Sequence, residues 1–178
     1  MSPAPTYPDA ARIIRELGLI PLPEEGGLFA ETYRDPDTIP AGVLAGRHGP
    51  RAASTAIYYL VNAAGFSNLH RVASAEVFHH YTGAPVQMLQ LHPGGSATTH
   101  VLGPDIAAGQ RPQVVVPRGV WQGTRLVDAA LEQAGAFALL GCTVAPGFDY
   151  ADYEHGRRAE LLASYPDHAA EILRLTSA

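Results

Sequence analysis

Residues 54–82 read STAIYYLVNAAGFSNLHRVASAEVFHHYT, and this stretch decides the fold. Its runs Ser54–Val61, Phe66–Val72 and Glu76–Thr82 are rich in β-branched and aromatic residues, which favour strands. Gly65 and a few small residues separate the runs, and no helical pattern lies between them. The stretch therefore predicts antiparallel strands joined by turns rather than parallel strands joined by helices.

The same pattern continues on both sides of this stretch. Glycine and proline, at 18 and 15 residues, punctuate the chain as they do in proteins built from many short strands. The further strand-like runs are Leu28–Tyr33, Pro85–Leu91, Thr98–Leu102, Gln113–Val116, Val120–Val127 and Ala136–Val144. About nine short strands without helical crossovers predict an all-β fold, an antiparallel barrel or sandwich.

Short helices are expected at both ends of the chain. Pro8–Leu19 has an apolar face at helical spacing, with Asp9 as N-cap and Gly18 just past the end. His155–Ala163 and Asp167–Leu175 have similar faces, and Asp35–Arg51 has the composition of a surface loop. With 178 residues and no linker, residues 1–178 are predicted to form one domain, with a barrel at about 26–154 and C-terminal helices at about 155–176.

Composition excludes several classes of protein. The net charge of −5 argues against a nucleic-acid partner, which calls for a basic surface. No apolar run approaches the ~18 residues of a membrane span, and Met1–Pro8 lacks the pattern of a secretory signal. The single cysteine, Cys142, cannot form an internal disulfide and is expected to be a buried, inert thiol. These features predict a cytoplasmic protein without a membrane partner.

Two segments carry candidate chemistry. The first runs from His70 to Gly83 and holds Glu76, and the second reads PRGVWQ from Pro117 to Gln122. A histidine and a glutamate that reach into a barrel from adjacent strands can bind a divalent metal or exchange a proton with a substrate. The alternatives are a core histidine with satisfied hydrogen bonds and a structural glutamate pair, so both readings stay open here.

The two segments resemble the motifs of the cupins. The first cupin motif is Gly, five residues, His-x-His, three or four residues, Glu, six residues, Gly. Gly65, His70, Glu76 and Gly83 take these places, although only four residues follow Gly65 and Val72 stands at the second histidine. In the second motif, Pro-x-Gly, two residues, His, three residues, Asn, the matches are Pro117 and Gly119, while Gln122 replaces the histidine and Leu126 the asparagine.

More narrowly, the chain resembles a branch of the cupins, found in bacteria and fungi, for which no reaction is settled. The shared phrases are EGGLFAETY at 25–33, ASTAIYYL at 53–60, PQVVVP at 112–117 and GCTVAPGFD at 141–149. The resemblance implies an antiparallel jelly-roll barrel that binds a small molecule, and a homodimer. Because open sheet edges need a partner or a cover, Leu28–Tyr33 is the strand expected to pair across the two-fold axis.

The departures from the motifs weaken the metal site that the resemblance implies. Metal cupins of the oxidase or dioxygenase kind use three histidines and a glutamate, whereas only His70 and Glu76 keep those places. His80, on the Glu76 side by strand alternation unless a bulge reverses it, and Gln122 complete a loose candidate set. Any ion bound there, Zn, Mn, Fe or Ni, is expected to be held weakly.

Three functions follow from the resemblance. In a metal-free isomerase or epimerase acting on a sugar or keto compound, His70 is the base, Glu76 orients it, and Tyr58 or Tyr59 is the acid. The alternatives are a metal-dependent lyase, isomerase or dioxygenase, and a module that binds a small ligand without chemistry. Trp121, Gln122 and Arg118 are expected at the pocket, whereas Glu24 and Glu25 are expected to be solvated surface charges.

Overall fold

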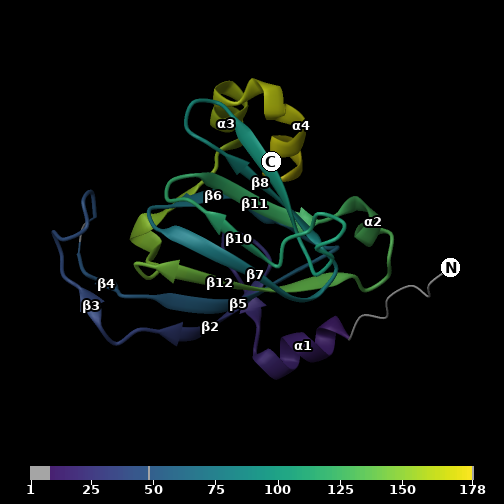
Figure 1. Ribbon diagram of the computed structural model, residues 1–178, viewed down its shortest axis with the longest axis horizontal. Coiled ribbons are helices and arrows are strands. Elements are labelled where there is room, and N and C mark those ends of the chain that lie inside the picture. The colour runs from purple at the N-terminus through teal and green to yellow at the C-terminus, as the bar shows by residue number, and fades with distance from the viewer. Residues whose placement is uncertain (1–8, 48, 178) are drawn as a thin grey trace.

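The structure is a computed structural model that describes residues 9–47 and 49–177 (Figure 1). Two antiparallel sheets face each other across the core. The larger has the order β1 (Ile20–Pro21), β2 (Leu28–Arg34), β5 (Thr55–Asn62), β12 (Phe137–Ala145), β7 (Ala75–Gly83) and β10 (Gln113–Val116). The smaller has the order β13 (Tyr153–His155), β6 (Ser67–Val72), β11 (Trp121–Leu126), β8 (Val86–Leu91) and β9 (Ala97–Leu102). The predicted all-β jelly-roll with short terminal helices is confirmed.

Strand alternation places the main core between the two sheets. In β7, Phe78 points inward and is buried, whereas Val77 and His79 on either side face outward. Val61 of β5 and Leu140 of β12 join Phe78 in the core. Each such side chain stabilises the fold by roughly 1.5–3 kcal/mol when it is fully removed from water.

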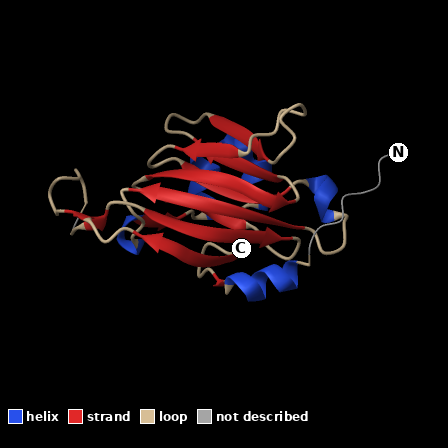
Figure 2. Ribbon diagram, turned by 60° about the horizontal axis from the view of Figure 1, so that its bottom comes forward, coloured by secondary structure: helices blue, strands red, loops and turns tan. Residues whose placement is uncertain are grey.

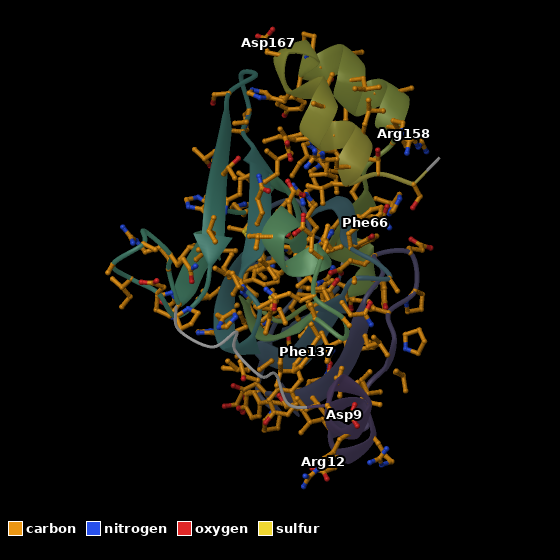
Figure 3. The ribbon with its side chains drawn as sticks, turned by 90° about the vertical axis from the view of Figure 1, so that its right-hand side faces the viewer. Asp9, Arg12, Phe66, Phe137, Arg158 and Asp167 are labelled. Atoms are coloured by element: carbon orange, nitrogen blue, oxygen red, sulfur yellow. The ribbon has the colours of Figure 1, made fainter. Side chains whose placement is uncertain are left out.

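Helix α1 (Ala10–Leu17) covers part of the outer face of the larger sheet. The Asp9 side chain accepts a hydrogen bond from the backbone N–H of Ala11 at 2.9 Å, and Gly18 ends the helix at φ 63°. Leu60 and Phe137 pack beneath it, and Figure 3 shows Phe137 on the side of the barrel that faces α1. The predicted helix and both caps are confirmed, but the helix ends at Leu17 rather than Leu19, and Pro8 lies outside the described residues.

The C-terminal helices cover the smaller sheet. Helix α3 (Arg158–Ser164), the 3₁₀ turn η2 (Pro166–His168) and helix α4 (Ala169–Arg174) lie together beside it, with Phe66 beneath them in Figure 3. Leu161 and Ile172 pack on Leu69 of β6 and Leu91 of β8. The helices leave most of the outer face of the larger sheet uncovered, as Figure 2 shows.

A thin arm extends from one end of the barrel. Strands β3 (Thr38–Ile39) and β4 (Arg51–Ala52) form this two-stranded ladder within the predicted loop (Figure 1). Arg51 donates two hydrogen bonds to the Asp152 carboxylate, at 2.9 and 2.8 Å. Both side chains are about 4% exposed, so this ion pair joins the arm to the 3₁₀ turn η1 (Tyr150–Asp152).

The edges of the larger sheet are β1 and β10. Strand β1 pairs only with Leu28 and Phe29, the first residues of β2. The rest of β2 therefore runs along the outer edge in the described part of the chain, so the homodimer through Leu28–Tyr33 stays a prediction.

A further short helix, α2 (Asp128–Leu131), follows β11. No helix among the described residues is long and apolar enough to cross a membrane.

Candidate functional site

A cavity of about 450 Å³ opens between the two sheets. Strands β2, β5, β7 and β12 form much of its wall, and the segments before β2 and around η1 complete it. The apolar part of the wall includes Leu22, Phe29, Ile57, Phe78, Val144 and Phe148. The polar part includes Glu25, Glu31, Arg34, Tyr59, Glu76, Cys142, Asp149 and Tyr153. A mostly apolar cavity with a few convergent polar groups is the usual form of a small-molecule site.

Four side chains meet at one side of this cavity: the buried His70, Glu76 and Gln122, and Glu25, whose side chain is 13% exposed, here called the polar cluster. The Gln122 amide nitrogen lies 2.7 Å from Nε2 of His70 and 3.4 Å from Oε2 of Glu76. His70 Nε2 is also 3.7 Å from Oε2 of Glu25. Only the two glutamates line the cavity, whereas His70 and Gln122, at 1% and 0% exposure, lie behind them.

The tautomer of His70 follows from its neighbours. Nδ1 lies 2.7 Å from the backbone carbonyl oxygen of Asn68, which can only accept, so Nδ1 carries the proton. Nε2 is then an acceptor, and the Gln122 amide donates to it. Burial lowers the pKa of His70, so the ring is neutral at pH 7. The Tyr153 ring stacks on it, with centroids 5.3 Å apart.

A bulge in β6 brings His70 and Ser67 to the same side of the sheet. The two residues are three positions apart and would face opposite sides of a regular strand. Gln122 pairs with His70 and Thr124 pairs with Ser67, so two steps along β11 oppose three along β6. Gly123 lies between the two pairs, and a Cβ there would come within 2.9 Å of the Ser67 carbonyl oxygen. The glycine therefore leaves the space that the bulge needs.

Glu25 is the main site residue that sequence reasoning missed, because it was expected in solvent. Its Oε1 accepts a hydrogen bond from Ser67 Oγ at 3.2 Å, and burial raises its pKa to about 7. The signal was the pair of glycines that follows. Gly26 and Gly27 have φ of 90° and 72°, and a Cβ on them would lie 2.5 Å from the Phe66 carbonyl oxygen and 2.7 Å from the Tyr59 hydroxyl. Only glycine permits so close a turn, which carries Glu25 inward.

Glu76 is the second buried carboxyl of the cavity. It is 5% exposed, and its nearest donors are distant: the Gln122 amide at 3.4 Å and the Cys142 thiol at 3.8 Å. Burial is the largest cause that raises its pKa, to about 7, and the nearby Glu25 carboxyl adds to the rise. Burial also raises the pKa of the Cys142 thiol, so it is not a thiolate at pH 7.

The two tyrosines expected as acids point in opposite directions. Tyr59 lines the cavity, and its hydroxyl donates a hydrogen bond to the Gly26 carbonyl oxygen at 2.9 Å. Tyr58 faces the outer side, where it packs edge-on against Tyr81 at 6.1 Å and lies near α1. The expectation that either could serve the cavity is therefore corrected for Tyr58, because neighbouring residues of a strand face opposite sides.

Two expected pocket residues lie elsewhere. Trp121 packs against the cluster beneath the C-terminal helices, with the Arg71 guanidinium 4.4 Å from its ring centroid. It faces outward because Gln122, the next residue of β11, faces inward. Arg118 is exposed and borders a separate pocket of about 200 Å³ near Arg47 and Ser74. Neither residue lines the cavity of the polar cluster.

The structure does not assemble the four predicted metal ligands. His80 turns to the face opposite His79 and Tyr81, and its Nε2 lies 3.0 Å from the carbonyl oxygen of Ala84, to which it donates. His80 is four steps along the strand from Glu76, about 13 Å, and Phe78 lies between them. No group of three or more His, Cys, Asp or Glu side chains that could hold a metal occurs in the described residues. With the His70 lone pair taken by Gln122, the donor set does not fit the metal centre that the cupin motif implies.

Comparison with known proteins identifies the family. The model of the Cupin superfamily (DUF985) matches residues 11–156. The chain belongs to this cupin family. It is similar to the uncharacterized protein YML079W of Saccharomyces cerevisiae, with 29% identity over 157 residues that cover 83% of this chain and 77% of the yeast protein.

Two solved cupin relatives cover nearly the whole chain. Protein SO0799 from Shewanella oneidensis is 32% identical, with a TM-score of 0.83 and coverage of 96% of this chain and 98% of that one. A hypothetical protein from Leishmania major is 31% identical, with a TM-score of 0.85 and coverage of 96% and 100%. These relatives support the fold and the family, so the chemistry of the site is argued from its own side chains.

Proposed function

We propose that this cupin binds a small molecule in its barrel and moves a proton to and from a carbon of that molecule, as isomerases and epimerases do. One observation carries the proposal: the buried Glu76 and the largely buried Glu25 line one cavity, and the pKa of each is raised to about 7. A general acid or base works best when its pKa lies near the operating pH. Buried carboxyls tuned in this way are characteristic of catalytic sites.

The pair can supply one base and one acid. Because two neighbouring carboxylates repel each other, one ionises more readily than the other. Both carboxyls accept hydrogen bonds that favour the ionised form, Glu25 from Ser67 and Glu76 from Gln122 and Cys142, and the proposal assigns Glu76 as the base. Glu25 then holds the proton. The substrate class is a sugar or keto compound with a hydrogen on the carbon beside its carbonyl group.

His70 takes a positioning role in this proposal rather than the role of base expected from the sequence. It does not line the cavity, and its acceptor nitrogen is occupied by Gln122. The hydrogen bond of Nδ1 to Asn68 fixes the ring, and the ring in turn orients the Gln122 amide between His70 and Glu76. The Tyr59 hydroxyl donates a hydrogen bond to the Gly26 carbonyl oxygen, and burial raises its pKa well above the usual 10, so it is not assigned as the acid.

The test is hydrogen exchange at carbon. The small-molecule fraction of a cell extract is incubated in D₂O with the wild-type protein or with Glu76→Gln, and mass spectrometry follows the compounds. We expect at least one compound to lose a C–H proton and gain deuterium with the wild type, and the exchange to be lost in Glu76→Gln. Glu160→Gln, at an exposed residue paired with Arg157, is the control and should exchange normally. A wild type that binds a compound without exchange would make the protein a binding module instead.

A further inference from the structure

The charged side chains that line the cavity are mostly acidic. Glu25, Glu31, Glu76 and Asp149 all line it, and Arg34 is the one basic side chain among the described lining residues. Each nitrogen of the Arg34 guanidinium already donates a hydrogen bond. Nε and Nη2 donate to the two carboxylate oxygens of Glu31 at 3.0 and 2.6 Å, and Nη1 donates to the Phe148 carbonyl oxygen at 3.3 Å. An anionic ligand would therefore meet several carboxyl groups and a guanidinium already paired with Glu31.

Aromatic rings form a continuous path along the cavity. Phe148 meets Tyr150 edge-on at 5.1 Å, Tyr150 meets Tyr153 at 6.3 Å, and Tyr153 stacks on His70 of the polar cluster. Phe29, Phe78 and Tyr59 line the same space. Aromatic faces attract organic cations through the ring quadrupole, and such walls beside carboxylates are the usual means of recognising ammonium groups.

Glu76 provides a place for the charged end of a ligand. Its carboxyl faces the cavity although the residue is 5% exposed, and both of its donors are long, at 3.4 and 3.8 Å. A buried carboxylate with such weak partners is costly unless an opposite charge approaches it. A cationic group at this point would supply that charge and would also lie close to Glu25.

We propose that the cavity takes an organic monocation, a protonated amine on a mainly apolar frame, with its ammonium group at Glu25 and Glu76. The inference rests on the proposed function in that it uses the same cavity, and it narrows the substrate class to amine-bearing carbonyl compounds. Phosphorylated and carboxylate compounds are excluded by the same charges. Binding of the cation favours the ionised form of Glu76, the base of the proposed function, because the opposite charge lowers the pKa of that carboxyl, while Glu25 keeps its proton.

The test uses three probes with one frame and three charges: 2-phenylethylamine, 2-phenylethanol and phenylacetate. Their binding to the wild type is measured by NMR titration at about pH 8, where the amine is still protonated. We expect the amine to bind ~10-fold more tightly than the alcohol and phenylacetate not to bind. Calorimetry of amine binding at about pH 7 in two buffers of different ionisation enthalpy should show release of protons.

Variants locate the binding site. Glu76→Gln should lose the preference for the amine over the alcohol while still binding the alcohol, and Glu160→Gln should behave as the wild type. Equal affinity for the amine and the alcohol, binding of phenylacetate, or no binding of the amine at millimolar concentration would each overturn the inference. The amine and the alcohol have no carbonyl group, so neither can undergo the proposed exchange. The comparison of their affinities is therefore independent of the exchange experiment. Charge selectivity without exchange would leave the inference standing and remove the proposed catalysis.

Discussion

Gln122 donates its amide to Nε2 of His70 across 2.7 Å and lies 3.4 Å from Glu76. This contact occupies the lone pair that a metal would need at His70. It also explains how a neutral histidine can stay buried, because both ring nitrogens are hydrogen-bonded, to Asn68 and to Gln122. Within this cupin, the glutamine at the place of a motif histidine replaces a ligand by a hydrogen-bond donor.

Gln122→Leu should therefore destabilise the protein and change the titration of Glu76. The variant leaves His70 Nε2 buried without a donor, which costs ~1–3 kcal/mol of unfolding free energy. The loss of the amide also raises the pKa of Glu76 further, because a donor to its ionised form is gone. Urea unfolding and ¹³C NMR of the carboxyl groups measure the two effects. Gln113→Leu, at an exposed position of β10, is the control, and equal behaviour of the two variants would contradict this account.

The parts of the fold that follow a short-range pattern could be predicted from the sequence. Strand β10 was expected at the bounds it has, and Asp9 and Gly18 cap α1 as their residue types predict. The strands β1 and β13 were missed because two or three residues are too few to show alternation. The cupin motif spacing was enough to indicate that His70, Glu76 and Gln122 could meet, as they do in the structure.

The parts of the site that depend on long-range contacts could not be predicted in this way. Glu25 is separated by 42 residues from Ser67, its hydrogen-bond partner, and nothing in its own segment shows that it turns inward except the two glycines. The bulge in β6 depends on Gly123 of another strand. The expectation for Trp121 failed for a simpler reason, since Trp121 and Gln122 are adjacent in a strand and cannot face the same cavity.

Stability should fall as the pH rises through 7. Folding raises the pKa of Glu76 from its usual 4.5 to about 7, so its contribution to stability is full below pH 4.5 and is lost as the pH rises through 7. Glu25 acts in the same direction. His70 acts in the opposite direction, because its lowered pKa costs stability only as the pH falls below 6.5. Above pH 6.5 the carboxyls therefore decide the slope.

Glu76→Gln should remove part of this slope. The neutral amide carries no charge that burial would destabilise. The free energy of unfolding of the variant should therefore exceed that of the wild type by ~1–3 kcal/mol at about pH 8, and this difference should vanish at about pH 5. Urea unfolding at a series of pH values measures the difference. Glu160→Gln should follow the wild type throughout, and parallel curves for Glu76→Gln and the wild type would contradict the raised pKa of Glu76.

Gly27→Ala should move the Glu25 side chain out of the polar cluster. The new Cβ would lie 2.7 Å from the Tyr59 hydroxyl and 2.9 Å from the Leu60 carbonyl oxygen, at a φ of 72°. Gly42→Ala is a matched control, because Gly42 has a φ of 84° but no atom within 4 Å of its Cβ position. We expect ~1–2 kcal/mol of destabilisation in the control from backbone strain alone and a larger loss in Gly27→Ala. In NMR titrations only Gly27→Ala should lower the pKa of the Glu25 carboxyl toward 4.5, because that carboxyl moves toward solvent.

Gln122→His should create a metal site that the wild type lacks. The substitution restores the second-motif histidine beside His70 and Glu76, and three protein ligands are the usual number for a zinc site with an open position. We expect about one Zn²⁺ per chain in the variant after dialysis against zinc, and sub-stoichiometric zinc with an unchanged fold in the wild type, measured by elemental analysis and circular dichroism. Trp121→His is the matched control, because its side chain points to the other face of β11 and should add no zinc. Binding in Gln122→His should weaken as the pH falls, since both histidines must be neutral to coordinate the ion. Full zinc occupancy of the wild type, with unfolding on chelation, would show that the hydrogen bond between Gln122 and His70 does not exclude a metal. A folded Gln122→His variant that stays free of zinc would show that His70 cannot turn its lone pair toward a metal ion.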